Sequence, residues 1–329
     1  MNERITWVDT AKGVGIVLVV FGHVWRGVQG AGLMPDDALF QAVDRAIYAF
    51  HMPFFFVLSG LFFAPAIVRN DAVPFFSQRL RRLIWPLFLW TWIFFLFKAA
   101  AGSVSNTPEN WSDFPFIPLP PQAHFWFLWA LFLIQITLYL TRPLLAGQPY
   151  RLWVWFGALV VAIAIALTLP GIQYLGGWAF GAFVHAPFLI LGILMVRFPP
   201  KCDGALTFAV HLCVFAAAIY VAVTLPQGRA LDLAIAAVAS YALCGLCVGL
   251  VARYPIGRLI NALASLGVAS MAIYVSHTIF AAAWRVALLT VGQNGLANHV
   301  ISGTVAGLAL PYIMWIIARR LRIAGLLGF

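Results

Sequence analysis

Several histidines stand inside or beside long apolar stretches of the chain, where ionisable side chains are rare. His23 ends the segment DTAKGVGIVLVVFGH, His51 opens HMPFFFVLSG and His277 ends YVSH. An imidazole has an unperturbed pKa of about 6.5, so at neutral pH its free nitrogen can accept a proton from a hydroxyl group. These residues are candidates for general-base chemistry inside an apolar environment. The alternative is that each imidazole is a packed core side chain, hydrogen-bonded to a neighbouring helix.

His23 is the strongest of these candidates because charged residues precede it on the same predicted helix. Lys12 lies about three turns before His23, which places the two side chains on one face, roughly 16 Å apart along the helix axis. Asp9 lies about one turn before Lys12. We expect Asp9 and Lys12 to pair and fix this helix at the inner membrane interface.

A second candidate site is the basic segment FFSQRLRRLIWP, in which Arg79 and Arg82 are spaced to share one face of a helix. Guanidinium groups pair with phosphate oxygens, so the two arginines could clamp a phosphate-bearing ligand at the cytoplasmic surface. They could equally be anchors that reach lipid phosphates. The spacing alone leaves both interpretations open.

The remaining candidates concern a sugar ligand. HFWFLWALF begins with His124 and contains Trp126, and an aromatic mouth below a Pro-rich loop suits stacking against a sugar ring. An interfacial aromatic belt is the alternative, and it explains most Trp residues at such places. Ser59 lies about 12 Å deeper than His51 on the same predicted span.

All of these residues must be positioned by membrane-spanning helices. The chain of 329 residues is 63% hydrophobic and 9% charged, whereas soluble domains carry about 25% charged residues. Because a span needs ~20 apolar residues, the pattern predicts an all-α polytopic membrane bundle of about ten transmembrane helices. We expect a single membrane domain over residues 1–329, with no cleavable signal peptide and no appended soluble domain. The predicted spans are 12–30, 46–68, 83–102, 124–141, 152–170, 176–196, 205–225, 231–251, 259–284 and 297–318.

The net charge of +10 is explained by membrane topology and does not require a nucleic-acid partner. Basic residues collect on the cytoplasmic side of membrane proteins. With both termini in the cytoplasm, most of the 20 Lys and Arg residues fall inside, and the loop 103–123 lies outside. The residues then left in the outer half are Arg26, Arg45, Lys98, Arg229 and Arg285.

No metal is expected, because no group of His, Asp and Glu has the spacing of metal ligands. Cys244 and Cys247 form a C-x-x-C within a predicted span. Small residues that pack helices together are a better interpretation of this pair than a redox or metal site.

Five ordered motifs carry a resemblance to a known family. RITWVDTAKGVGIVLVVFGH, HMPFFFVLSG, the R-x-x-R of Arg79 and Arg82, HFWFLWALF and IYVSH together resemble the acyltransferase-3 family of integral membrane O-acyltransferases. The opening motif is most similar to the fucose O-acetylase-like branch. The family has a basic residue and a histidine on its first span; here these are Lys12, where many relatives have Arg, and His23.

The resemblance implies transfer of an acyl group from cytoplasmic acyl-CoA, most simply acetyl-CoA, to a hydroxyl of an extracytoplasmic or lipid-linked saccharide. Arg79 and Arg82 would hold the CoA phosphates, and the sugar would approach past His124 and Trp126. His23 would be the general base, with Asp9 and Lys12 fixing its helix, and an acyl-histidine intermediate is the variant left open. His51, Ser59 and His277 would contact the acceptor.

Two other functions remain open. A transporter or flippase for a lipid-linked saccharide would use the same polar path and need no acyl-CoA. A membrane scaffold for envelope-polysaccharide enzymes would not need its buried histidines. In each case the expected location is the inner membrane of a bacterium, in contact with lipids and with an unassigned oligomeric state.

Overall fold

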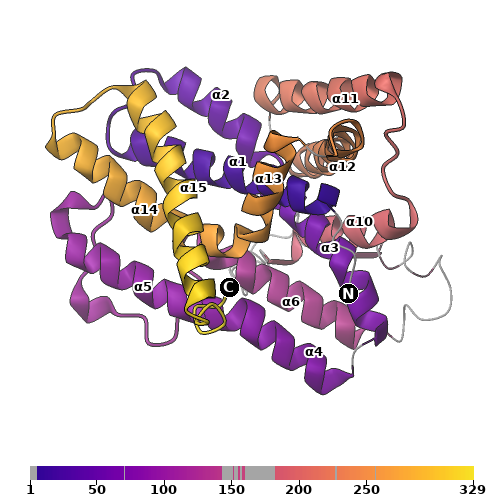
Figure 1. Ribbon diagram of the computed structural model, residues 1–329, viewed down its shortest axis with the longest axis horizontal. Coiled ribbons are helices and arrows are strands. Elements are labelled where there is room, and N and C mark those ends of the chain that lie inside the picture. Colours follow the sequence, from indigo (N-terminus) through magenta and orange to yellow (C-terminus); the bar gives the residue numbers. More distant parts are fainter. Residues whose placement is uncertain are drawn as a thin grey trace.

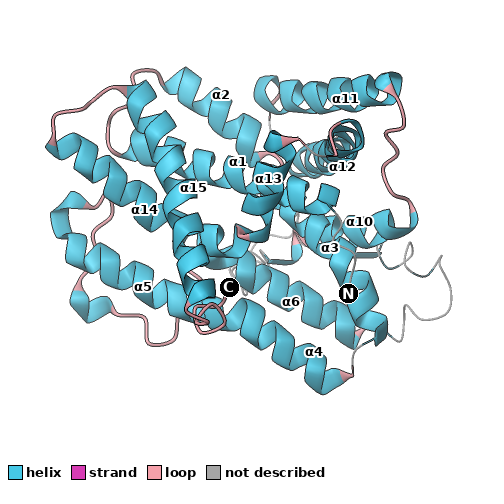
Figure 2. Ribbon diagram, in the orientation of Figure 1, coloured by secondary structure: helices cyan, strands magenta, loops and turns pink. Residues whose placement is uncertain are grey.

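The computed structural model describes residues 6–69, 71–142, 182–226, 228–255 and 257–329, together with a few residues between 151 and 159. Within these residues every regular element is helical, and Figure 2 shows the described chain as helices joined by loops. The predicted all-α fold class is therefore confirmed.

The principal helices are connected mostly by short loops. In chain order they are α1 (Thr6–Gly30), α2 (Asp37–Tyr48), α3 (His51–Arg69), α4 (Ala72–Arg79), the π-helix η1 (Leu80–Ile84), α5 (Trp85–Ala101), α6 (Trp126–Leu140), α10 (Ala186–Arg197), α11 (Ala205–Thr224), α12 (Arg229–Arg253), α13 (Arg258–Val268), α14 (Ser270–Thr290) and α15 (Leu296–Arg320). Three 3-10 turns, η2 (Gly102–Val104), η3 (Trp111–Asp113) and η4 (Ala123–Phe125), lie between α5 and α6.

Eight helical segments of the described chain are long and apolar enough to cross a membrane. Helices α10 and α13 are apolar but shorter. Of the predicted spans, 152–170 and the first part of 176–196 lie almost wholly outside the described residues. Length and composition thus agree with a polytopic bundle.

Helix α1 is the central element of the bundle. It contacts α2, α3, α12, α13, α14 and α15, and Figure 1 shows it in the middle of the molecule. Two glycines permit its close crossing with α13: a Cβ on Gly13 would overlap the backbone of Leu263, and one on Gly267 would overlap the backbone of Asp9. Small residues let membrane helices approach this closely.

The predicted span 259–284 is not one helix. Helix α13 ends at Val268 and α14 begins at Ser270, with Ala269 between them at φ −86° and ψ 4°. This conformation lies outside the regular helical region. The break separates the segment that crosses α1 near Asp9 from the segment that carries His277.

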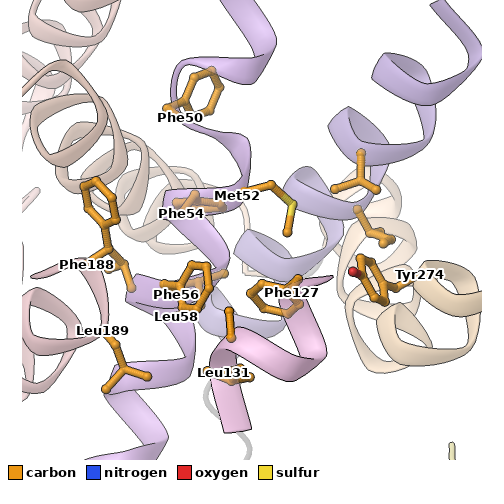
Figure 3. Close-up of a cluster of buried hydrophobic side chains, with 14 of the residues drawn as sticks. Phe50, Met52, Phe54, Phe56, Leu58, Phe127, Leu131, Phe188, Leu189 and Tyr274 are labelled. Carbon is orange, nitrogen blue, oxygen red and sulfur yellow. The ribbon is translucent and has the colours of Figure 1, made fainter. Parts of the chain in front are cut away.

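Aromatic side chains join α3, α6 and α10 into the apolar core shown in Figure 3. The rings of Phe56 and Phe127 meet edge to face at 4.8 Å, a favoured geometry for aromatic pairs. Phe188 and Leu189 of α10 are also buried in this cluster. This packing fixes the start of α6, and with it the turn that carries His124.

Candidate active site

Three histidines from three different elements meet inside the bundle. His23 lies on α1, His124 on η4 and His277 on α14. Their ring centroids are 4.9 Å apart for His23 and His277, 5.5 Å for His23 and His124, and 5.1 Å for His124 and His277. Residues separated by more than two hundred positions along the chain therefore form one cluster of imidazoles, which we call the histidine cluster.

Backbone carbonyls determine the tautomer of two of these rings. Nδ1 of His23 lies 2.8 Å from the carbonyl oxygen of Val19, and Nδ1 of His277 lies 2.8 Å from that of Tyr274. A carbonyl can only accept a hydrogen bond, so Nδ1 carries the proton in the neutral ring. Nε2 of each ring is then a free base, as proton abstraction from a hydroxyl requires.

Burial distinguishes the members of the histidine cluster. His124 and His277 are 5% and 0% exposed, whereas His23 is only partly buried. Nε2 of His124 and of His277 is buried and forms no hydrogen bond with any described residue. Buried polar atoms normally have partners, so these nitrogens are available to a polar ligand that reaches the cluster beside His23.

A tyrosine connects the cluster to His51. The Tyr48 ring lies 6.3 Å from that of His23 and 4.4 Å from that of His51. Tyr48 Oη and His51 Nε2 are buried and without a hydrogen-bonding partner in the described chain. His51 therefore belongs to the same polar region, but it lies behind Tyr48 and outside the three-histidine cluster.

An ion pair covers Tyr48. Arg26 donates from Nε to Asp44 Oδ1 at 2.6 Å and from Nη2 to Asp44 Oδ2 at 2.9 Å, and its guanidinium carbon lies 3.2 Å from the centre of the Tyr48 ring. Tyr48, Arg26 and Asp44 are parts of the site that the sequence motifs did not predict. The available signal was spacing, since Arg26 follows His23, and Tyr48 precedes His51, by three residues.

Two residues that were predicted to bind the acceptor saccharide lie away from the histidine cluster. Trp126 packs against His185, with ring centroids 4.9 Å apart, and against Phe56. Ser59 donates its hydroxyl hydrogen bond to the carbonyl of Phe55 in its own helix, at 2.8 Å. Neither contact involves His23, so the structure brings His124 to the cluster without its neighbour Trp126.

The charged end of α1 is distant from the cluster. Lys12 Nζ lies 4.3 Å from the centre of the Phe62 ring on α3, and the backbone of Asp9 lies at the crossing with α13. With His23 roughly 16 Å further along the axis, neither residue can contact a group that reacts at the histidine. Both are placed to fix α1. Their mutual pairing remains a prediction.

Arg79 and Arg82 differ in their surroundings. Arg79 is 9% exposed, donates from Nε to Gln135 Oε1 at 2.8 Å and lies over the Phe75 ring at 4.4 Å. Arg82 is exposed, as is Arg81. The π-helix η1 begins directly after Arg79, and its wider turn removes the shared face that regular α-helical spacing would give. Only Arg79 of this pair is a buried cation.

Among the residues that the structure describes, no group of three or more His, Cys, Asp or Glu side chains could hold a metal ion. The imidazoles of the histidine cluster can take up a proton, return it, and orient a ligand through hydrogen bonds.

A helical bundle with these long apolar segments is an integral membrane protein. The sequence model of a protein family described as "Acyltransferase domain" matches residues 5–316. The chain belongs to the acyltransferase-3 family.

Curated relatives are similar over a shorter part of the chain. Nodulation protein NolL of Mesorhizobium japonicum is 28% identical over 202 residues, which cover 60% of this chain and 49% of that protein. Nodulation protein NolL of Sinorhizobium fredii is 27% identical over 197 residues, covering 60% and 50%. The matched part thus spans about half the length of these relatives. No solved structure matches the chain significantly.

Proposed function

We propose that the protein is a membrane O-acyltransferase that moves an acyl group, most simply acetyl, from cytoplasmic acyl-CoA to a hydroxyl of an extracytoplasmic or lipid-linked saccharide. The observation that carries this proposal is the histidine cluster. His23 has its Nδ1 proton held by Val19 and is the least buried ring of the cluster. Membership of the acyltransferase-3 family supplies the reaction class.

His23 is the general base in this mechanism. Its Nε2 takes the proton of the acceptor hydroxyl while the hydroxyl oxygen attacks the thioester carbonyl. The new C–O bond forms, the C–S bond breaks, and the imidazolium returns its proton to the departing thiolate, so CoA leaves as the free thiol. His277 and His124 surround the reacting group, and their unpartnered Nε2 atoms can accept hydrogen bonds from acceptor hydroxyls.

Arg79 is the proposed donor-binding residue. It is a buried cation whose Nε donates to an uncharged partner, the side-chain amide of Gln135. A guanidinium in this setting is suited to the phosphate groups of CoA. Arg82, which is exposed, is a secondary contact at the rim. The thin pantetheine arm would then extend between helices toward His23.

The residues that bind the acceptor are assigned by their chemistry. Tyr48, His51 and His277 offer hydroxyl and imidazole groups to a sugar, and aromatic rings surround them. The opening motif favours the fucose O-acetylase-like branch of the family. Trp126 and Ser59 remain proposed contacts further along the acceptor path.

The test is transfer of a labelled acyl group. Membrane vesicles from cells with the wild-type chain, with His23→Gln and without the chain are supplied with acetyl-CoA labelled in its acetyl carbons. Saccharides and glycolipids are then analysed by mass spectrometry. The proposal is supported if the saccharide is labelled in wild-type vesicles and not in the two other kinds of vesicle. Saccharide movement across the membrane without label incorporation would establish the flippase alternative instead.

A further inference from the structure

The feature that carries a further inference is Arg285, near the end of α14 that is predicted to face outward. Nη2 of Arg285 donates to Asn106 Oδ1 at 3.1 Å, and Asn106 Nδ2 in turn donates to the carbonyl oxygen of Gly27 at 3.1 Å. The side chain is partly buried. It therefore lies between the loop after α5 and helix α1.

Glycine at position 27 makes this placement possible. A Cβ on Gly27 would collide with Nη1 of Arg285, so the absence of a side chain lets the guanidinium lie directly against α1. Gly27 is one turn beyond His23, a distance of about 6 Å along the helix. Side chains on α14 also lean toward its N-terminal end, which is the direction of His277. Arg285 thus lies above the histidine cluster.

Arg285 differs from two other cations of the predicted outer half in the partner that it contacts. Two other cations of the predicted outer half form ion pairs, Arg26 with Asp44 at 2.6 Å and Lys98 with Glu109 at 2.5 Å. No carboxylate in the described part of the chain pairs with Arg285, whose hydrogen-bonding partner is a neutral amide. A partly buried guanidinium with free donors is suited to bidentate contact with a phosphate or carboxylate.

We propose that Arg285, positioned by Asn106 against Gly27, binds a phosphate or carboxylate group carried by the acceptor saccharide. Arg285 is then a specificity-determining residue: it selects anionic acceptors and sets their reacting hydroxyl about one helical turn below, at His23. This inference rests on the proposed acyl transfer for its biological meaning. The binding of an anionic saccharide can nevertheless be measured without any transfer.

The experiment measures equilibrium binding by isothermal titration calorimetry to the full chain in phosphatidylcholine nanodiscs at fixed ionic strength. The probes are glucose 1-phosphate, glucuronate, glucose and inorganic phosphate. We expect the wild-type chain to bind glucose 1-phosphate or glucuronate at least about tenfold more tightly than glucose, because charge-assisted hydrogen bonds are the stronger class. Arg285→Gln should abolish this preference, and Arg285→Lys should keep part of it.

Arg229→Gln is the matched control, since Arg229 is an exposed arginine of the same predicted side, and it should keep the full preference. The proposal is overturned if wild type shows no preference for anionic sugars, if inorganic phosphate binds as tightly as glucose 1-phosphate, or if Arg285→Gln and Arg229→Gln behave alike.

Two further arms separate the remaining explanations. Nanodiscs containing phosphatidylglycerol test a lipid headgroup as the ligand: competition that removes glucose 1-phosphate binding from wild type would overturn the saccharide assignment. Charge preference that persists in a wild-type chain unable to transfer acyl groups would refute the proposed function and leave the Arg285 site standing.

Discussion

At the scale of single residues, local hydrogen bonds determine which ring nitrogen of each histidine carries the proton. Nδ1 of His23, His51 and His277 lies within 3.0 Å of the carbonyl oxygen four residues earlier in the chain, at Val19, Ile47 and Ile273. Each neutral ring is thereby the Nδ1–H tautomer, with Nε2 as the acceptor. Partial exposure makes His23 the most accessible ring of the histidine cluster.

The first prediction concerns His23. His23→Gln should lower the rate of acyl transfer by roughly 10²–10⁴-fold, because the amide keeps a similar size but cannot take up the proton. Protein level and monodispersity in detergent should stay near wild type. The measurement is label transfer from acetyl-CoA at matched protein concentration.

His211→Gln is the control for histidine replacement. His211 lies on α11, hydrogen-bonds to the carbonyl of Lys201 at 3.1 Å and has no contact with the histidine cluster, so its replacement should leave transfer unchanged. His51→Gln and His277→Gln should give intermediate losses. Wild-type transfer by His23→Gln would return this residue to a packing role.

At the scale of elements, the π-helix η1 decides which arginine is buried. It interrupts the continuous helix between α4 and α5 directly after Arg79. Single-turn π-helical insertions in α-helices are frequent at functional sites. Here the insertion leaves Arg79 against Gln135 of α6 and turns Arg82 outward.

The second prediction follows from this asymmetry. Arg79→Gln should raise the KM for acyl-CoA about tenfold or more, since charge-assisted contacts contribute about 1.5–3 kcal/mol each. Arg82→Gln should have a smaller effect, and Arg81→Gln should resemble wild type. Steady-state kinetics with each substrate varied separately is the measurement. An equal effect of all three changes would show that these residues only anchor the helix in the membrane.

The third prediction concerns the crossing of α1 and α13. Gly267→Ala should reduce the free energy of unfolding by about 1–3 kcal/mol, because the added methyl group must displace the backbone of Asp9. Gly325→Ala is the control, since a Cβ there meets open space. Thermal unfolding in detergent, followed by tryptophan fluorescence, compares the two. A lower apparent Tm is expected for Gly267→Ala alone; equal values would mean that the helices can separate at no cost.

The sequence predicts elements better than it predicts contacts between them. Long apolar runs define the helices, and histidines within them stand out because buried ionisable groups are rare. The contact of Arg285 with Asn106 joins residues 179 positions apart, and no local pattern encodes it. The break at Ala269 was not predicted because the hydropathy of the sequence is continuous from α13 to α14. Only the backbone conformation of Ala269 shows that the helix ends there.

At the scale of the whole molecule, the proposed reaction requires a path between two compartments. Arg79 and the histidine cluster lie on different helices that meet the central helix α1 or its neighbours, and Figure 1 shows α4 and α2 at opposite margins of the bundle. A donor bound near Arg79 and an acceptor bound near Arg285 would therefore approach His23 from opposite ends. The predicted orientation in the membrane assigns the donor end to the cytoplasm and the acceptor end to the outside.

The fourth prediction tests that orientation. In a chain with Cys202, Cys213, Cys244 and Cys247 replaced by Ser, a cysteine introduced at Ser112 should react with an impermeant maleimide in intact cells. A cysteine at Asp203 should react only after the inner face is opened. Both positions are exposed, so accessibility to the reagent reports sidedness. The reverse pattern would invert the topology and place the histidine cluster nearer the cytoplasm.

The bonds that hold the imidazoles have a consequence for motion. Nδ1 of His23 and Nδ1 of His51 each donate to the carbonyl oxygen of the residue four positions earlier in the chain. Nδ1 of His277 does the same within α14. For His23 and His277 the carbonyl belongs to the same helix, whereas Ile47 lies on α2 and His51 on α3. Proton placement is therefore a local property of α1 and of α14. A movement of α1 relative to α14 would leave the Nδ1 protons of His23 and His277 in place, so no proton would have to relocate before the next turnover.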